Sequence, residues 1–173
     1  AARRGWLVGA VVTAALIGLE IAAHRAGKPR GELRVTALDV GQGDSLLVDL
    51  PDGSLMVIDG GGLVGSPIDT GERVLAPALR ARRRSRVDVV VLSHPHPDHF
   101  TGLLHGLDAV EIGEIWDTGE VDARQTAPLW RAFLREQALR GARVVRPGEL
   151  CAGPRAFGGA SVEALSPCPL DDD

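Results

Sequence analysis

The stretch VDVVVLSHPHPDHFTGL, residues 87–103, joins an aliphatic run directly to a cluster of histidines. The run VDVVVL is rich in valine, as is typical of a strand buried on both faces of a layered α/β structure. Three of the chain's five histidines, His94, His96 and His99, then fall within six positions together with Asp98. This concentration at the end of a buried strand indicates a functional site.

Two prolines restrict the shape of the loop. The residue before a proline favours an extended conformation, which applies to His94 before Pro95 and to His96 before Pro97. Side chains two positions apart in an extended chain point to the same side, so the two imidazoles are expected to face one point. Asp98 is expected at the N-cap of the helix that follows.

The side chains of this loop offer the nitrogen and oxygen donors that Zn²⁺, Mn²⁺ or Fe binds. A donor set without cysteine fits a catalytic site with open positions, and its spread suits one or two ions. The alternative is a polar loop whose histidines bond to the backbone, which so dense a cluster disfavours. We predict these metal ligands: His94, His96, Asp98 and His99. His105 and His24 are expected to lie outside the site.

The rest of the soluble part contains short strands and helices. Residues 33–62 contain three strand-like segments separated by GQGDS and PDG, and the Asp-Gly pair is a strong hairpin signal. Helices are expected over residues 72–84, 100–107 and 127–141, and further strands within 112–119, 142–149 and 160–165. Hairpin strands followed by strands that alternate with helices indicate an α/β domain with a mixed sheet.

An apolar segment, GWLVGAVVTAALIGLEIAA at residues 5–23, precedes this domain. Its length is close to the ~20 residues that cross a bilayer as a helix, and Trp6 lies where an interfacial aromatic is expected. The alternative is a signal peptide, for which Arg3 and Arg4 give the basic start. The expected organisation is a transmembrane segment or signal-like anchor at 1–24, a linker at 25–32 and the domain at 33–173.

Charge and cysteine content limit the partners. A net charge of −4 gives no overall electrostatic reason to bind nucleic acid, so a polyanion needs a local patch or metal ions. A weak candidate patch for nucleic acid, with a solvated helix end as the main alternative, consists of Arg80, Arg82, Arg83, Arg84 and Arg86. Cys151 and Cys168 are expected to be free, with one bridge as the alternative if the domain lies outside the cytoplasm.

The motif HPHPDH resembles the HxHxDH signature of the metallo-β-lactamase superfamily. The stretches at 38–62 and 87–103 resemble the C-terminal domain of ComEC-type proteins, the integral membrane proteins of DNA internalisation in competent bacteria. The resemblance covers roughly residues 33–165. It implies an αβ/βα sandwich, of which this chain holds the N-terminal half, with a metal site at one edge of two packed sheets.

The resemblance also implies roles for the residues of the loop. His94 and His96 would hold one metal position, and Asp98 and His99 the other. Asp98 would in addition orient or deprotonate the attacking water.

Two earlier aspartates are candidates to support this site. Asp59 in VIDGGG matches an aspartate that supports the metal loop in the superfamily, with a simple turn residue as the alternative. Asp44 in GQGD is a second candidate, with a Gly-Asp turn equally expected. Family members carry three later ligands, two of them histidines, whereas this chain has no histidine after His105. We therefore expect a domain that is incomplete at its C-terminus.

The resemblance implies a metal-dependent hydrolase domain of a ComEC-like membrane protein in DNA uptake for competence. Hydroxide bound to one or two ions of Zn²⁺ or Mn²⁺ would cleave a phosphodiester, as in a nuclease. Two alternatives stay open: another hydrolase of this fold, acting on a thioester, lactone or small phosphoester, or a truncated, non-catalytic domain. The enzyme is expected in the full-length protein, and activity of this piece alone stays open.

Expected partners are the membrane, through residues 5–23, DNA as substrate, and other parts of a larger competence channel. The expected location is the cytoplasmic membrane, with the domain on its extracytoplasmic face, where incoming DNA arrives. The charges oppose this orientation, because the basic residues after the apolar segment outnumber the two before it and favour the cytoplasm. These following residues are Arg25, Lys28, Arg30 and Arg34.

Overall fold

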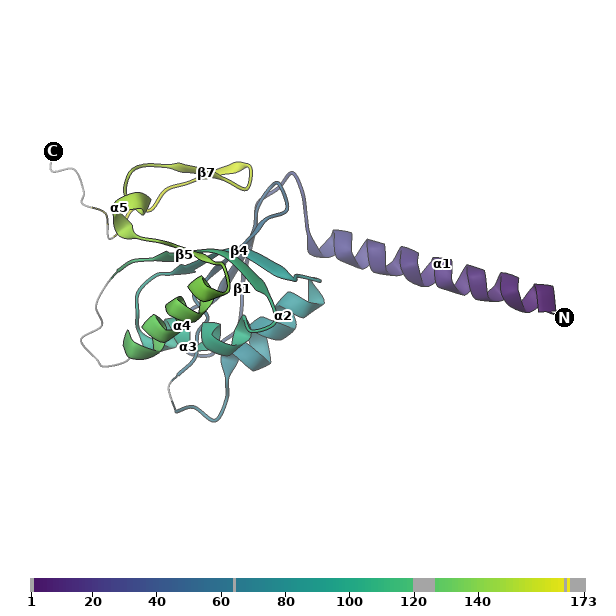
Figure 1. Cartoon of the computed structure of the whole chain (residues 1–173), viewed down its shortest axis with the longest axis horizontal. Coiled ribbons are helices and arrows are strands. Elements are labelled where there is room, and N and C mark those ends of the chain that lie inside the picture. Colours follow the sequence, from purple (N-terminus) through teal and green to yellow (C-terminus); the bar gives the residue numbers. More distant parts are fainter. Residues whose placement is uncertain (1, 64, 120–126, 167, 169–173) are drawn as a thin grey trace.

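The computed structural model describes residues 2–63, 65–119, 127–166 and 168. Helix α1 (Ala2–Gly27) projects from a layered α/β unit that contains the remaining elements (Figure 1). In that unit a six-stranded sheet has helices on one face and a two-stranded hairpin over the other. The mixed α/β architecture confirms the predicted fold class.

The large sheet is built in chain order. Its strands are β1 (Arg34–Ala37), β2 (Leu46–Asp49), β3 (Leu55–Ile58), β4 (Arg86–Leu92), β5 (Glu111–Asp117) and β6 (Arg143–Val145). The first three pair antiparallel, which confirms the predicted hairpins, and β3 to β6 pair in parallel. Because parallel strands run in one direction, the C-terminal ends of β3 and β4 meet at one edge of the sheet.

The helical layer encloses the main hydrophobic core. It contains the π-helical turn η1 (Gly71–Leu75), α2 (Ala76–Ala81), α3 (Pro97–Gly106) and α4 (Ala127–Leu139). Phe100 of α3 and Trp130 of α4 pack with Val57 and Val90 of the sheet in one buried cluster. The single helix predicted over 72–84 is instead η1 followed by α2. Pro77 suits the first turn of α2, because it has no backbone N–H to leave unbonded.

A smaller core lies on the opposite face of the sheet. Helix α5 (Pro147–Leu150) and the hairpin of β7 (Arg155–Phe157) and β8 (Ala160–Val162) cover it. Trp116 of β5 packs there with Phe157. The sequence analysis did not predict β7, and it placed residues 147–149 in a strand. In the structure Pro147 begins α5 instead, because its fixed φ and missing N–H suit the first helical turn.

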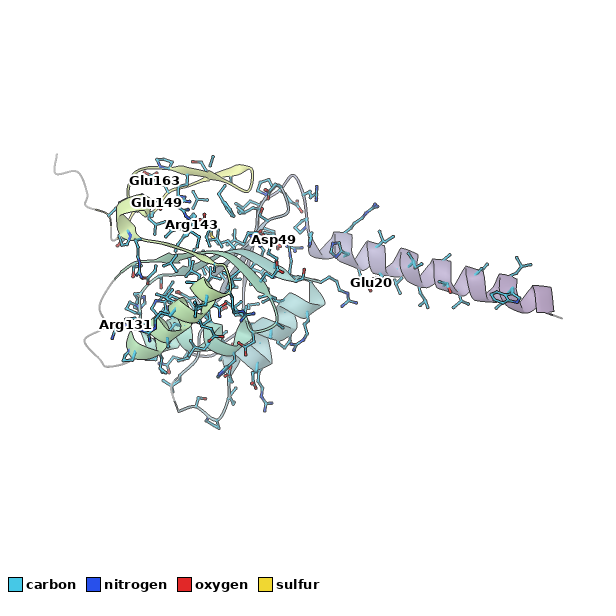
Figure 2. The ribbon with its side chains drawn as sticks, viewed as in Figure 1. Glu20, Asp49, Arg131, Arg143, Glu149 and Glu163 are labelled. Carbon is cyan, nitrogen blue, oxygen red and sulfur yellow. A yellow bond between two sulfur atoms is a disulfide. The ribbon has the colours of Figure 1, made fainter. Side chains whose placement is uncertain are left out.

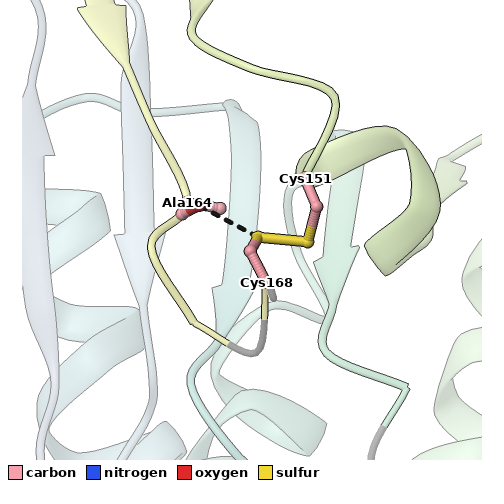
Figure 3. The surroundings of a disulfide bond; sticks show 3 residues. All are labelled: Cys151, Ala164 and Cys168. Atoms are coloured by element: carbon pink, nitrogen blue, oxygen red, sulfur yellow. Dashed lines mark hydrogen bonds between the residues drawn. A yellow bond between two sulfur atoms is a disulfide. The ribbon is translucent and has the colours of Figure 1, made fainter. Parts of the chain in front are cut away.

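The two cysteines form a disulfide, so the expectation of two free cysteines was wrong. Cys151 follows α5 and Cys168 lies beyond β8, and their Cα atoms are 5.1 Å apart (Figure 3). The hairpin turns the chain back on itself, so residues 17 positions apart in sequence come into bonding range. The bridge therefore closes the segment that covers the smaller core.

Helix α1 is longer than the predicted apolar segment. Residues Gly5–Gly27 have a mean hydropathy of 2.0 and are long and apolar enough to cross a membrane. The large apolar side chains of this segment are exposed, among them Trp6, Leu16 and Leu19. The first three residues of the linker predicted at 25–32 are helical, which corrects that boundary. The helix ends at Gly27, which packs against the backbone of Arg82. A Cβ at position 27 would lie 2.2 Å from the Arg82 carbonyl oxygen, so a side chain does not fit there.

Candidate metal centre

The predicted metal loop connects β4 to α3 at the C-terminal edge of the parallel strands. His96 is the N-cap of α3, with φ −87° and ψ 146°, so it is extended as predicted. Asp98 does not occupy the N-cap, as had been expected, but lies in the first helical turn. Pro97 explains the shift, because its fixed φ and missing N–H suit the first helical position.

The three histidine side chains of the loop cluster. The ring centroid of His94 lies 4.5 Å from that of His96 and 3.9 Å from that of His99. The chain turns at Pro95, where the His96 amide donates to the His94 carbonyl over 2.9 Å. Burial, followed by the neighbouring His99 and His96, lowers the pKa of His94 below its usual range. The neutral imidazole is thereby favoured, which is the form that binds metals.

Asp59 lies at the centre of the hydrogen bonds that hold this loop. It follows β3, is 2% exposed and has a φ of +56°, a conformation that aspartate tolerates better than most residues. Its Oδ2 accepts hydrogen bonds from His99 Nδ1 over 2.8 Å and from Ser93 Oγ over 2.5 Å. Its Oδ1 accepts from the Ser93 amide over 2.8 Å. A carboxylate on one ring nitrogen is the usual support of a metal-binding histidine, and it leaves His99 Nε2 for the ligand.

Ser93 completes this arrangement and was not predicted. Because its single hydroxyl hydrogen goes to Asp59, its oxygen accepts from His94 Nδ1, which lies 3.0 Å away. His94, like His99, then has Nε2 left for a ligand. Its place between the buried strand and the first histidine was the available sequence signal. The resemblance assigned Asp59 to the support of the loop, but it gave no role to Ser93.

The glycines after Asp59 allow the end of β3 to approach α3. The Gly60 amide donates to the His99 carbonyl over 2.6 Å, and the Gly102 amide donates to the Gly61 carbonyl over 2.9 Å. A Cβ at Gly60 would lie 2.5 Å from the Leu103 amide nitrogen, so a side chain does not fit there. This close contact of backbones sets the position of Asp59 relative to His99.

The two remaining carboxylates are close to the loop but less constrained. The Asp98 side chain is half-buried and makes no hydrogen bond to another described residue. Asp44 is exposed, and its neighbour Gly43 packs on the Asp98 backbone: a Cβ at Gly43 would lie 1.6 Å from the Asp98 carbonyl oxygen. The GQGD turn therefore contacts the metal loop, while the Asp44 carboxylate has no hydrogen-bond partner among the described residues.

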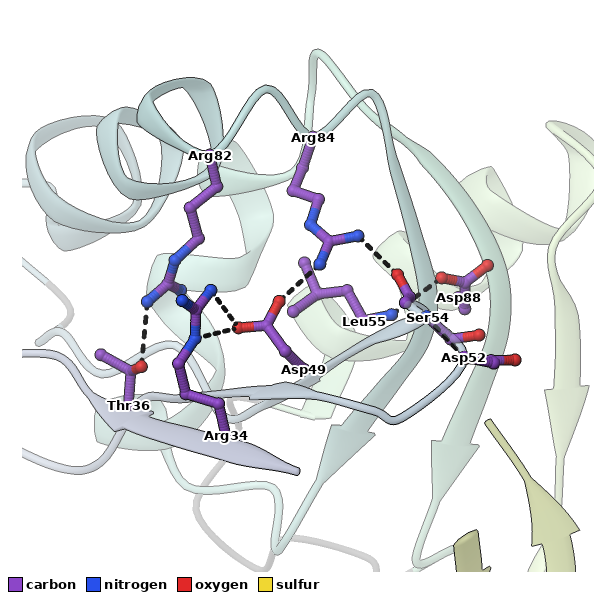
Figure 4. A network of polar contacts seen from close by, with 10 residues as sticks. Arg34, Thr36, Asp49, Asp52, Ser54, Leu55, Arg82, Arg84 and Asp88 are labelled. Atoms are coloured by element: carbon purple, nitrogen blue, oxygen red, sulfur yellow. Dashed lines mark hydrogen bonds and ion pairs between the residues drawn. The ribbon is translucent and has the colours of Figure 1, made fainter. Parts of the chain in front are cut away.

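The structure does not gather the predicted arginine cluster into one surface for nucleic acid. Arg84 is buried and bonds to Asp49, with Nη2 2.5 Å from Oδ1 (Figure 4). Arg82 donates to Thr36 Oγ1 over 2.9 Å. Two others pair with carboxylates, Arg83 with Glu20 and Arg86 with Asp88. Of the five arginines in the predicted cluster, Arg80 is the one with an exposed side chain and no ion pair to a described residue.

A second group of titratable side chains lies at the other end of α3. Ligand-type atoms of Asp69, Glu72 and His105 lie within 4.8 Å of one another. Asp69 accepts hydrogen bonds from His105 Nδ1 over 2.5 Å and from the Glu72 amide over 3.0 Å. Glu72 and His105 are exposed. The proximity of these three side chains is explained by the pair of His105 with Asp69 and by the hydrogen bond from the Glu72 amide to Asp69 at the start of η1.

The family model for the Metallo-beta-lactamase superfamily matches residues 38–170. The chain belongs to this superfamily. The described residues fit the divalent metal that membership implies: three clustered imidazoles, a free carboxylate at Asp98 and a supporting carboxylate at Asp59 form a set of nitrogen and oxygen donors.

Comparison with individual proteins gives partial matches to this metallo-beta-lactamase domain. It is 35% identical over 80 residues to ComE operon protein 3 of Bacillus subtilis (strain 168), covering 40% of this chain and 10% of that protein. Among solved structures it is similar to a new diphosphatase from the PhnP family, with a TM-score of 0.41, 18% identity, and coverage of 68% of this chain and 41% of that one. It is also similar to the hydrolase AbOPH in the beta lactamase superfamily, with a TM-score of 0.36 and 17% identity. That match covers 68% of this chain and 53% of the other.

Proposed function

We propose that this chain is the hydrolase domain of a ComEC-like membrane protein, and that it cleaves phosphodiesters in DNA during uptake. The metal ligands in this proposal are His94, His96, Asp98 and His99. The observation that carries it is the imidazole cluster whose Nδ1 atoms at His94 and His99 are engaged through Ser93 and Asp59. The similarity to ComE operon protein 3 supports the biological setting.

Each residue of the loop has a separate task in this proposal. A divalent cation, Zn²⁺ or Mn²⁺, activates water and neutralises phosphate charge when it is bound. Asp59 and Ser93 hold the His99 and His94 rings in one orientation. The carboxylate of Asp98 is free of other hydrogen bonds among the described residues, so one of its oxygens can accept the proton of the attacking water. Asp44, on the turn that packs against the Asp98 backbone, stays a candidate to support the site.

The disulfide supports an extracytoplasmic position for the domain. Such bridges persist in oxidising compartments and are rare in the cytoplasm, and the chain pairs Cys151 with Cys168. Helix α1 would anchor the domain in the cytoplasmic membrane, next to other parts of a competence channel. Added protease should remove the domain from intact spheroplasts; protection until lysis would place it in the cytoplasm.

Metal analysis of the purified chain tests the site directly. We expect bound Zn²⁺ or Mn²⁺ at about one ion or more per chain in the unaltered protein and in His105→Ala. His94→Ala should lose that metal, because it removes a central ring of the cluster. Equal metal content in the unaltered protein and in His94→Ala would reject the proposed centre.

Substrate choice is tested with the same proteins. A labelled single-stranded oligonucleotide should be cut in the presence of Mn²⁺ by the unaltered chain and not by Asp98→Asn. Hydrolysis of a thioester or lactone without cleavage of DNA would favour another hydrolase of this fold. Bound metal without turnover of any of these substrates would favour a non-catalytic role of the domain.

A further inference from the structure

The C-terminal half of α1 lies beside the end of α2. Arg83 Nε is 2.8 Å from Glu20 Oε1, and Arg83 Nη2 is 3.4 Å from Glu20 Oε2. Seven residues later, Gly27 abuts the Arg82 backbone. Figure 2 shows Glu20 on the part of α1 nearest the domain. Two contacts therefore fix the basic end of α2 against the last turns of the apolar helix.

The length of α1 places this contact relative to a bilayer. Glu20 stands about 10 Å before the helix end at Gly27, at ~1.5 Å per residue. The uncharged stretch from Gly5 to Leu19 is about 22 Å long, which is shorter than the ~30 Å hydrocarbon core. A membrane that contains this stretch therefore reaches the level of Glu20, and its headgroups surround the last turns of α1. Arg83 lies at that level because it pairs with Glu20.

Cationic side chains gather around the same end of the helix. The side chains of Arg25, Lys28 and Arg80 make no hydrogen bond or ion pair with any described residue. An open hollow of about 630 Å³ lies at the junction between helix and domain, lined by His24, Arg25, Lys28, Pro29 and Arg30. We define the junction surface as the cations of this region: Arg25, Lys28, Arg30, Arg80 and Arg83. Glu20 is the acidic side chain paired within it.

We propose that the junction surface binds the phosphate headgroups of anionic phospholipids and holds the hydrolase domain against the membrane. The inference rests on the membrane anchoring of α1 in the proposed function. Lipid is favoured over DNA because Arg83 pairs with the apolar helix itself, so a bilayer brings phosphates to it without a further partner. Cations near an anionic membrane surface each strengthen binding by roughly fivefold.

The test uses the full chain in nanodiscs of phosphatidylcholine, with or without phosphatidylglycerol. A nitroxide at Ala81→Cys, an exposed position in α2, reports collisions with a water-soluble nickel chelate. Phosphatidylglycerol should lower this collision rate, and about 0.5 M salt, with a Debye length of about 4 Å, should restore it. The double variant Arg80→Gln/Arg83→Gln should lose the lipid response. The matched control Arg131→Gln/Arg135→Gln, on exposed positions of α4, should keep it.

Three outcomes would overturn the inference. The first is an equal collision rate in both lipids for the unaltered chain. The second is an unchanged lipid response after substitution of Arg80 and Arg83. The third is protection of the label by a single-stranded oligonucleotide in phosphatidylcholine discs without any response to phosphatidylglycerol, which would assign these arginines to DNA. Metal content measured on the same samples separates this inference from the proposed function, because docking does not require the metal centre.

Discussion

Helix α3 contains a histidine near each end that bonds to an aspartate from another part of the chain. The two histidine–aspartate pairs differ in burial. At the N-terminal end, His99 and Asp59 lie 2.8 Å apart with side chains 12% and 3% exposed. At the C-terminal end, His105 and Asp69 lie 2.5 Å apart with side chains 56% and 30% exposed. Water competes for the second pair, whereas backbone and Ser93 enclose the first. The buried His99–Asp59 pair therefore holds the metal loop in place, whereas the exposed His105–Asp69 pair is a surface contact.

The largest expected difference between the two pairs is in metal affinity. Asp59→Asn keeps a side chain that tolerates the positive φ but removes the charge that holds His99. Loss of such a partner costs roughly 10–100-fold in metal affinity. Asp69→Asn, the matched control, should leave the affinity unchanged. Competition with a chromophoric chelator measures both, and equal affinities in the two variants would remove the functional distinction between the pairs.

A smaller effect is expected from the hydroxyl beside Asp59. Ser93→Ala removes a hydrogen bond to a buried carboxylate and should lower the free energy of unfolding by about 1.5–3 kcal/mol. Ser45→Ala removes a buried hydroxyl that has no hydrogen-bond partner among the described residues, so it should be neutral or stabilising. Urea unfolding at neutral pH compares the two variants. An equal loss in both would mean that the hydroxyl of Ser93 contributes nothing specific.

The smallest effect concerns the pH dependence of the exposed pair. The hydrogen bond to Asp69 raises the pKa of His105 above its usual 6.5. Burial alone would raise the pKa of Asp69, but the hydrogen bonds from His105 and the Glu72 amide outweigh it and lower that pKa below 3.8. The stability due to His105 is thus fully present below pH 6.5 and lost as the pH rises through its raised pKa. The part due to Asp69 is lost as the pH falls through its lowered pKa.

His105→Gln tests this window. It should lower the free energy of unfolding by only about 0.2–1 kcal/mol near pH 5.5, because the pair is exposed to solvent. Near pH 9 the variant and the unaltered chain should be equally stable. Urea titrations at both pH values give the difference, and a larger loss at the alkaline pH would contradict the assigned direction.

Local patterns predicted much of the fold. The Asp-Gly turn, the valine run and the prolines of the metal loop act over a few residues, and the structure contains the corresponding hairpin, β4 and the extended His96. The periodicity of residues 127–141 likewise predicted α4. Predictions were wrong where two local signals conflicted. Asp98 favours the N-cap of α3, but Pro97 favours the first helical position, so the helix begins at Pro97 and Asp98 lies in its first turn.

The sequence by itself determined which donors gather at the end of β4, because His94, His96 and His99 are neighbours along the chain. The family resemblance pointed to Asp59 as their support, but only the tertiary structure decided which atoms it holds, namely Ser93 Oγ and His99 Nδ1. Asp59 lies 40 residues before His99, and the parallel pairing of β3 with β4 brings it to the same edge. The disulfide and the Glu20–Arg83 contact arise in the same way. Contacts between distant residues depend on how strands and helices pack, and a single sequence does not record that packing locally.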